Sequence, residues 1–409
     1  MLSAETVRPR AGLIGAAVVF TLFSLNFGAY RVFGDGVDYY SFVQRLFGDR
    51  PNGSGYNFGT GLMNAPFYGV GHVVKLVVGD GRIGRHVLPA SITLASIAYV
   101  LLAMTLTAWL LGQLRLPLRG FVLVVTVFGS PVWYYASFSP AYTHAADAAA
   151  FAIATVCLFR AITHADPRWY VLAGAACGLE LAVRPFNVGV VAGACAALVA
   201  ARKVRPALLV GAASAAAYGV LVLVPLALGT GLRTRASGET VASGGGVLGF
   251  APLTPLRMLF TPHRGLFVWT PVTALGVIGF ILLMRRRREH RLFLAVLGAM
   301  GAGLLLMHAS LLWWDGGWSF SMRYLASLLP LYAVGLGGLL DAVRSRRRAA
   351  VIAAATACAL WSVFLGMSHA FGARQSDNAF QVASRHSPGQ FAHLTWSYSR
   401  VRHLVDRLR

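Results

Sequence analysis

Residues 87–111 read VLPASITLASIAYVLLAMTLTAWLL, a long run without a single charged side chain. A helix of about 20 mostly apolar residues is long enough to cross the hydrocarbon core of a bilayer. Runs of this kind follow one another through most of the chain, with only short polar breaks between them. Because lipid offers no hydrogen-bond partners to the backbone, repeated runs of this length predict a bundle of membrane-spanning helices.

The composition points to the same class of protein. Hydrophobic residues make up 57% and charged residues 12% of the 409 positions, and the mean hydropathy is +0.64. Soluble domains contain far more charge. We therefore expect an all-α, polytopic membrane helix bundle that has no room for a large soluble domain.

Length and hydropathy predict about eleven spans. They cover residues 11–30, 87–111, 120–137, 144–162, 169–183, 187–201, 206–228, 266–284, 292–312, 324–343 and 349–367. Two segments leave alternatives open. Residues 62–78 either span or lie at the interface, and residues 169–201 form either two short helices or one long helix. Two helices are favoured, because one helix would bury Arg184 near the middle of the membrane.

The charge distribution orients these spans. Lys and Arg number 36 against 14 Asp and Glu, and the arginines cluster in short breaks such as 285–288 and 344–348. Such clustering is typical of cytoplasmic loops, so the N-terminus is predicted to be cytoplasmic. The net charge of +22 therefore indicates contact with anionic membrane lipids, and no nucleic-acid partner is expected. The four cysteines lie within apolar runs, without the spacing of a disulfide framework or a zinc site.

This topology defines three outer segments. The first outer loop, residues 31–86, is expected to carry interfacial helices, and the middle outer loop covers 229–265. Residues 1–367 form the bundle, and residues 368–409 form an amphipathic tail at the outer face, because apolar residues recur there at helical spacing.

Polar side chains gather at the outer end of the predicted bundle. Carboxylates, histidines and arginines together can supply a base, hydrogen-bond donors and an anion clamp. The candidates are Asp35, Asp38, Tyr39, Tyr40, Asn57, His144, Asp147, Arg184, His263, Arg264, Asp315 and Arg323. Their clustering suits group transfer from a phosphate-linked donor held in the membrane.

Four motifs resemble those of bacterial GT-C-type membrane glycosyltransferases. They are 34–40 (GDGVDYY), 57–68 (NFGTGLMNAPFY), 262–267 (PHRGLF) and 313–324 (WWDGGWSFSMRY). This superfamily includes protein mannosyltransferases and lipid A aminoarabinose transferases. The resemblance implies a polyprenyl-phosphate sugar as donor and a catalytic carboxylate in the first outer loop. Gly36 follows the first aspartate where the family commonly has Glu, and the chain lacks a large outer domain of the kind that often contacts acceptors.

The resemblance implies the role of the carboxylates in the first outer loop, and the chemistry of the other side chains suggests theirs. Asp35 would be the general base, with Asp38 as the second choice. The donor phosphate would be bound by Arg184, His263, Arg264 and Arg323, and the substrates by Tyr39, Tyr40, Asn57, His144, Asp147 and Asp315. Transfer by direct displacement would invert the anomeric carbon.

Each candidate also has a structural interpretation. Asp35 and Asp38 could cap an interfacial helix, and Arg184 could reach lipid headgroups. His144 and Asp147 could cap and pack a helix, while Asp315 could pair with Arg323.

The function expected from these observations is transfer of a sugar from a polyprenyl-phosphate donor to an acceptor at the outer face of the bacterial cytoplasmic membrane. A transporter or lipid flippase, or a non-catalytic membrane subunit, is the alternative. Midplane ionisable residues and paired broken helices would favour a transporter. No spacing indicates a divalent metal, so the cofactor is unknown. The sequence specifies neither the sugar, the acceptor class nor the oligomeric state.

Overall fold

The computed structural model of the protein describes residues 4–51, 58–81, 83–229, 248–249, 251–386, 388–400, 402–403 and 406. Helices dominate this part of the chain. The α-helices are α1 (Ala4–Phe27), α2 (Gly36–Leu46), α3 (Phe58–Val78), α4 (Gly84–Gln113), α5 (Arg119–Phe128), α6 (Val132–Ser137), α7 (His144–His164), α8 (Pro167–Val183), α9 (Val188–Ala200), α10 (Val204–Ala227), α12 (Thr254–Phe260), α13 (Leu266–Trp269), α14 (Val272–Arg286), α15 (Arg291–Ala309), α16 (Leu329–Ala342), α17 (Ser345–Gly372), α18 (Ala379–Ser384) and α19 (Pro388–Tyr398). Short 3₁₀ turns are η1 (Pro185–Asn187), η2 (Arg288–His290) and η3 (Arg323–Leu328).

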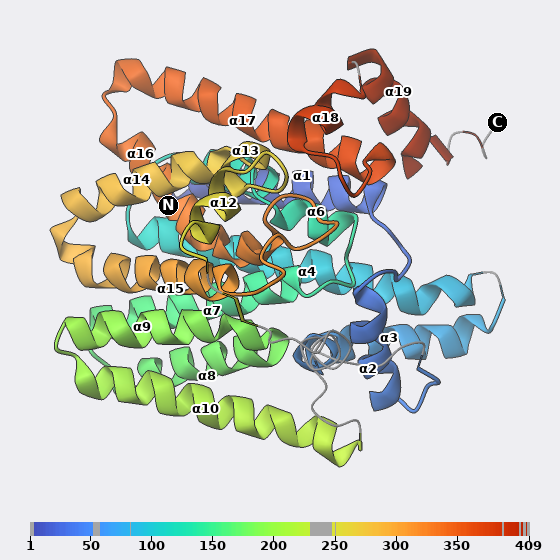
Figure 1. Ribbon diagram of the computed structural model, residues 1–409, viewed down its shortest axis with the longest axis horizontal. Coiled ribbons are helices and arrows are strands. Elements are labelled where there is room, and N and C mark those ends of the chain that lie inside the picture. The colour runs from blue at the N-terminus through green and yellow to red at the C-terminus, as the bar shows by residue number, and fades with distance from the viewer. Residues whose placement is uncertain are drawn as a thin grey trace.

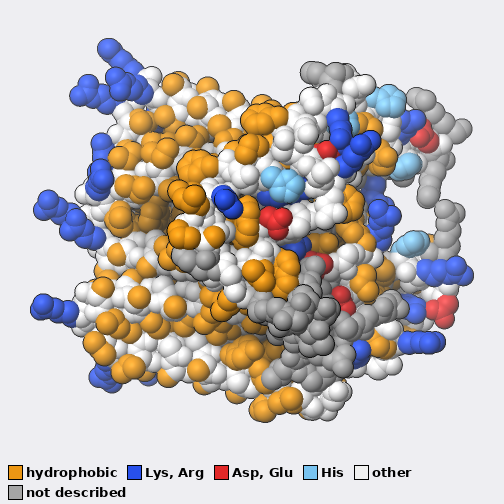
Figure 2. Space-filling model, viewed as in Figure 1, with side chains coloured by type: hydrophobic (Ala, Val, Ile, Leu, Met, Phe, Trp, Pro, Cys, Tyr) orange, Lys and Arg blue, Asp and Glu red, His pale blue; other side chains and the backbone are white. Residues whose placement is uncertain are grey.

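The long helices run side by side, with their ends gathered at two opposite ends of the bundle (Figure 1). The turns between α9 and α10, α14 and α15, and α16 and α17 share the left end in this view, and the C-terminus lies at the right. Figure 2 shows Lys and Arg side chains along the left edge, with a broad apolar surface beside them. The basic breaks therefore lie together at one end, as the charge pattern predicts.

The expected all-α polytopic fold is confirmed. Every predicted span contains helix, and among the described residues six helices are long and apolar enough to cross a membrane. These six are Gly84–Gln113, His144–His164, Val204–Ala227, Arg288–Ala309, Arg323–Ala342 and Ser345–Gly372. Shorter apolar helices cover 11–27, 119–128 and 185–200. The chain is a multi-pass membrane protein.

Prolines divide several predicted spans. Residues 169–201 form two helices, because Arg184 has an extended backbone (φ −149°, ψ 107°) directly before Pro185. Two other spans, 120–137 and 266–284, were each expected to be one helix. The first is interrupted between α5 and α6 before Pro131, and the second between α13 and α14 before Pro271, because proline has no N–H to continue the helical ladder.

The segment predicted to be the first outer loop, residues 31–86, contains two helices, α2 and α3, that lie together beside the start of α4 (Figure 1). Residues 62–78, for which both a span and an interfacial segment were considered, belong to α3. This helix contains Pro66, and it is not among the long apolar helices counted above. At the other end of the chain, α17 continues to Gly372, five positions beyond the predicted boundary at residue 367.

Helices α14 and α16 approach most closely where small residues face one another. A Cβ atom at Gly335 would collide with the backbone of Gly276, and one at Gly279 would collide with the Gly335 carbonyl oxygen. Small residues allow membrane helices to pack at this distance, so that dispersion contacts hold the pair together.

Gly335→Ala is therefore expected to destabilise the bundle, because overpacking of this kind costs about 1–3 kcal/mol. Gly219→Ala on α10 is the matched control, since a Cβ there meets no atom within 4 Å and alanine is the better helix former. The measurement is thermal unfolding of both variants in the same detergent. Equal melting temperatures for the two variants would contradict this packing.

Candidate functional site

Asp35 lies in the loop that joins α1 to α2. Gly34 adopts φ +55°, and a Cβ there would collide with the hydroxyl of Tyr142, so a glycine fits at this turn. Asp35 is the residue before α2, yet its side chain makes no capping hydrogen bond. Instead its Oδ2 accepts a hydrogen bond from Nη1 of Arg323 at 3.0 Å. The carboxylate therefore pairs with an arginine 288 positions away in the sequence.

Arg323 begins the 3₁₀ turn η3 and is 9% exposed. Its guanidinium carbon lies 5.9 Å from the centre of the Tyr142 ring and 5.4 Å from that of Tyr324. Cation–π contacts of this kind stabilise a desolvated arginine. Its Nε has no hydrogen-bond partner among the described residues. The guanidinium thus retains a donor for an anionic ligand.

A second arginine lies against the same Tyr324 ring. Arg184, at the end of α8, has its guanidinium carbon 4.9 Å from the centre of that ring. Its Nη1 lies 3.5 Å from Oδ2 of Asp147, and its Nη2 lies 3.3 Å from Nε2 of His308. Two arginines therefore meet at one aromatic ring, and one of them is paired with Asp35.

The surroundings of Arg184 include two of the predicted residues, His144 and Asp147, and two others, Asn187 and His308. His144 Nδ1 lies 3.5 Å from Nη1 of Arg184, and Asn187 donates a hydrogen bond of 2.5 Å to Asp147. His144 and Asp147 are thus bridged by Arg184. His308, on α15, stacks on Tyr324 with ring centres 4.7 Å apart. In the sequence, the only sign of a role for His308 is its position near the end of a predicted apolar span.

Glu180 was also missed by the sequence interpretation. It lies one turn before Arg184 on α8 and is fully buried, and neither carboxylate oxygen has a hydrogen-bond partner among the described residues. An ionisable residue inside an apolar span is by itself a sign of function. It lies within the predicted span 169–183, away from the helix ends where the other polar candidates gather.

Arg264 has a different environment from the other two arginines. It is fully buried and donates hydrogen bonds to four backbone carbonyls at 2.8 to 3.3 Å, those of His263, Gly317, Gln375 and Asp377. Its donors therefore connect the loop before α13 to the loop after α15 and to the segment after α17. This geometry favours a structural role over the phosphate-binding role expected from the sequence.

Arg264→Met is accordingly expected to destabilise the protein, since each buried carbonyl left without a donor costs about 1–3 kcal/mol. The measurement is the melting temperature, compared with that of Arg257→Met, which removes an exposed basic side chain in the last turn of α12. A melting temperature like that of the Arg257 variant would contradict the structural role.

His263 and Asp315 are neighbours of Arg264. Burial, with the charge of Arg264, lowers the pKa of His263, so the imidazole is neutral at pH 7. A neutral imidazole can donate a hydrogen bond to phosphate but adds no positive charge. Asp315 accepts a hydrogen bond from the Gly317 backbone N–H at 3.2 Å, and the ion pair of Arg323 is with Asp35. This contact indicates that Asp315 stabilises the turn at residues 315–317.

The remaining candidates lie on or near α2. Tyr39 and Tyr40 are both 6% exposed. Tyr40 packs edge-on against Tyr68 of α3, with ring centres 5.6 Å apart, which supports packing over direct substrate contact. Asp38 is half-buried in the first turn of α2. Asn57 lies outside the described residues.

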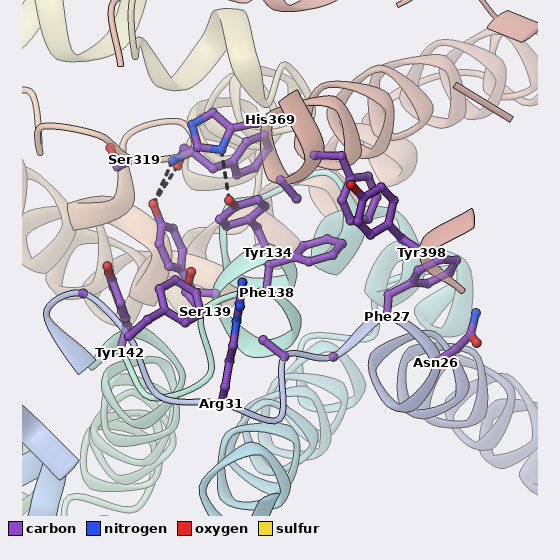
Figure 3. A pocket seen from close by; sticks show the side chains of 18 of the residues that line it. Asn26, Phe27, Arg31, Tyr134, Phe138, Ser139, Tyr142, Ser319, His369 and Tyr398 are labelled. Atoms are coloured by element: carbon purple, nitrogen blue, oxygen red, sulfur yellow. Dashed lines mark hydrogen bonds between the residues drawn. The ribbon is translucent and has the colours of Figure 1, made fainter. Parts of the chain in front are cut away.

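A cavity of about 980 Å³ adjoins the Asp35–Arg323 pair. Gly34 and Tyr142 line it, so its wall includes the neighbour of Asp35 and a ring that Arg323 covers. Figure 3 shows Tyr142 and Ser139 on one side of this cavity, Tyr134 and His369 at its top, and Tyr398 with Phe27 on the other side. The space is large enough for a ligand of several sugar rings.

Among the described residues, no group of three or more His, Cys, Asp or Glu side chains is arranged to hold a metal ion. No protein-family model matches the chain, and no curated protein matches it. Among solved structures, the chain is similar to the crystal structure of ArnT from Cupriavidus metallidurans bound to undecaprenyl phosphate. The identity is 12% and the TM-score 0.48, over 94% of this chain and 76% of that chain. At this level of similarity, the interpretation of the site depends on the geometry of this chain.

Proposed function

We propose that this protein is a GT-C-type membrane glycosyltransferase. It transfers a sugar from a polyprenyl-phosphate donor to an acceptor at the outer face of the bacterial cytoplasmic membrane. The observation that carries the proposal is the ion pair between Asp35 and Arg323, with Arg184 against the same Tyr324 ring as Arg323. A carboxylate and a desolvated cationic region are the two groups that transfer from a phosphate-linked sugar requires.

The location of these groups supports the proposal. Asp35 follows α1, Arg184 ends α8 and His308 lies in the last turn of α15. Each of these helices reaches the end of the bundle opposite the basic turns (Figure 1). Because arginine-rich turns are typical of the cytoplasmic side, the site lies at the outer face, the N-terminus is cytoplasmic and the tail from residue 368 is external.

In the proposed reaction, the donor phosphate binds Arg323 and draws the guanidinium away from Asp35. The released carboxylate then accepts the proton of an acceptor hydroxyl as that oxygen forms a bond to the anomeric carbon. The bond between the anomeric carbon and the phosphate oxygen breaks, and its electron pair remains on the phosphate. The products are the glycosylated acceptor, with inverted configuration, and polyprenyl phosphate. Asp35 afterwards releases its proton to water.

Arg323 and Arg184 stabilise the charge that develops on the leaving phosphate. Guanidinium groups present planar arrays of donors that match phosphate oxygens, and burial strengthens the interaction. Asp147, Asn187 and His308 hold Arg184 in position through the contacts described above. Asp38 remains a candidate for contact with the acceptor, and His263 for a hydrogen bond to the donor.

The experiment is to follow a radiolabelled polyprenyl-phosphate sugar with the purified full-length protein in lipid nanodiscs and proteoliposomes. The proposal predicts release of polyprenyl phosphate, and faster release when an acceptor extract is added. A transporter or flippase would move the intact lipid between leaflets without breaking the bond. Recovery of intact donor on the opposite leaflet, with no polyprenyl phosphate formed, would refute the proposal in favour of that alternative.

A further inference from the structure

The cavity beside Asp35 has an unusual charge. Its lining includes two arginines and two histidines, and no Asp or Glu contributes to it among the described residues. The arginines are Arg31, directly after α1, and Arg400, in the tail. Because the charged residues of this lining are all basic, the cavity is suited to an anionic occupant.

Neither arginine is neutralised by another described side chain. The guanidinium carbon of Arg31 lies 5.5 Å from the centre of the Phe33 ring, and Figure 3 shows this side chain extending into the cavity between Ser139 and Phe138. Arg400 donates to the backbone carbonyl of Gly28 at 3.3 Å and lies over the Tyr30 ring, 3.9 Å from its centre. Both guanidinium groups therefore retain donors that are not bound to a carboxylate.

A buried histidine at the top of the cavity points to a ligand independently. His369 is 6% exposed, and its Nδ1 lies 2.9 Å from the hydroxyl of Tyr134 (Figure 3). Its Nε2 is buried and has no hydrogen-bond partner among the described residues. Buried polar atoms are rarely left without a partner, so this nitrogen is expected to contact a bound hydroxyl or water.

The walls suit a saccharide. Phe27, Phe138 and Tyr398 present flat apolar faces, while Ser139, Tyr134 and Tyr142 present hydroxyls. Sugar rings have apolar faces and polar edges, and a pocket that binds them needs both kinds of surface. The tail completes this wall, because Tyr398 stacks on Phe371 with ring centres 4.4 Å apart and Ser399 donates to Asn26 at 3.0 Å.

From these observations we infer that the cavity binds the acceptor, and that the acceptor is a saccharide carrying an anionic group, with Arg31 and Arg400 holding the anion. This inference rests on the proposed function, since Asp35 borders the cavity through Gly34 and Tyr142. The donor phosphate binds on the other side of Tyr142, at Arg323. A phosphate or a carboxylate on the saccharide would satisfy the same two arginines.

The test uses the full-length protein in nanodiscs and four probes: glucose 6-phosphate, glucuronate, glucose and inorganic phosphate. Calorimetry or saturation-transfer NMR gives the affinities. At least one of the two anionic sugars is expected to bind about tenfold or more tightly than either glucose or phosphate alone, because ring contacts and a charge-assisted hydrogen bond act together. Whichever anionic sugar binds more tightly identifies phosphate or carboxylate as the preferred group.

Two variants and one matched control locate the binding. Arg31→Gln and Arg400→Gln are each expected to weaken the anionic sugar about tenfold. Arg402→Gln is the control, because Arg402 lies in the same tail but does not line the cavity and pairs with Asp406. It is expected to bind as the wild type does. Melting temperatures establish that all three variants are folded.

Three outcomes would overturn the inference. These are equal affinity for glucose and both anionic sugars, equal losses in the Arg400 and Arg402 variants, and displacement of the sugar by polyprenyl phosphate, which would assign the cavity to the donor. Donor cleavage, measured in the same preparation without acceptor, tests the proposed function separately. Cleavage without binding of either anionic sugar would refute only this inference.

Discussion

Asp35→Asn is expected to reduce sugar transfer by about 10²–10⁴-fold, the range that a general base contributes. The amide has the same size and still accepts a hydrogen bond from Arg323, but it cannot take the proton of the acceptor hydroxyl. Because Asp35 makes no capping hydrogen bond to α2, the helix does not depend on its charge. The variant should therefore remain folded, with a melting temperature lowered by the loss of the ion pair to Arg323.

The matched control for this variant is Asp38→Asn, which lies three positions later in the first turn of α2. Its effect is expected to be milder, since Asp38 is not the partner of Arg323. Transfer from the same polyprenyl-phosphate sugar is measured for both proteins, together with thermal unfolding. A stable Asp35→Asn protein with near-normal turnover would remove Asp35 as the base, and a reversed order would assign that role to Asp38.

Arg323→Gln is expected to reduce transfer by about 10²–10³-fold, the loss seen when one donor that stabilises transition-state charge is removed. The effect should fall on the turnover number more than on donor affinity, because charge on the phosphate oxygen increases as the bond breaks. Arg346→Gln, an exposed arginine in the first turn of α17, is the control. Steady-state kinetics over a range of donor concentrations separate the two parameters.

An Arg323→Gln protein that loses donor affinity but keeps its turnover number would restrict this residue to ground-state binding. A variant with unaltered kinetics would exclude it from the site altogether. Loss of activity in the Arg346 variant as well would indicate a general loss of folded protein, which the melting curves would reveal.

The helices could be predicted from the sequence because apolar length determines them locally. Residues 87–111 contain enough apolar side chains to span a bilayer whatever packs around them. The break at Arg184 could also be predicted, because Pro185 restricts the residue before it. The breaks before Pro131 and Pro271 follow from the same rule, but the apolar runs around them concealed these turns.

The candidate site was predictable only in part. Asp35 and Arg323 could be identified as polar residues at one end of the bundle, but their pairing depends on contacts between elements 288 residues apart. In the sequence, Arg264 and Arg323 are both arginines beside an apolar span. Only the fold brings four backbone carbonyls within hydrogen-bonding distance of Arg264. Glu180 is surrounded in the sequence by apolar residues. The last turn of α8 brings it close to Arg184, four positions later.

The most direct test of the central claim is a cryo-electron microscopy structure of the protein with polyprenyl phosphate bound. The account predicts a phosphate within hydrogen-bonding distance of Arg323, with the ion pair to Asp35 opened and the carboxylate facing the cavity lined by Tyr142. A phosphate bound elsewhere, with the Asp35–Arg323 pair intact, would contradict it.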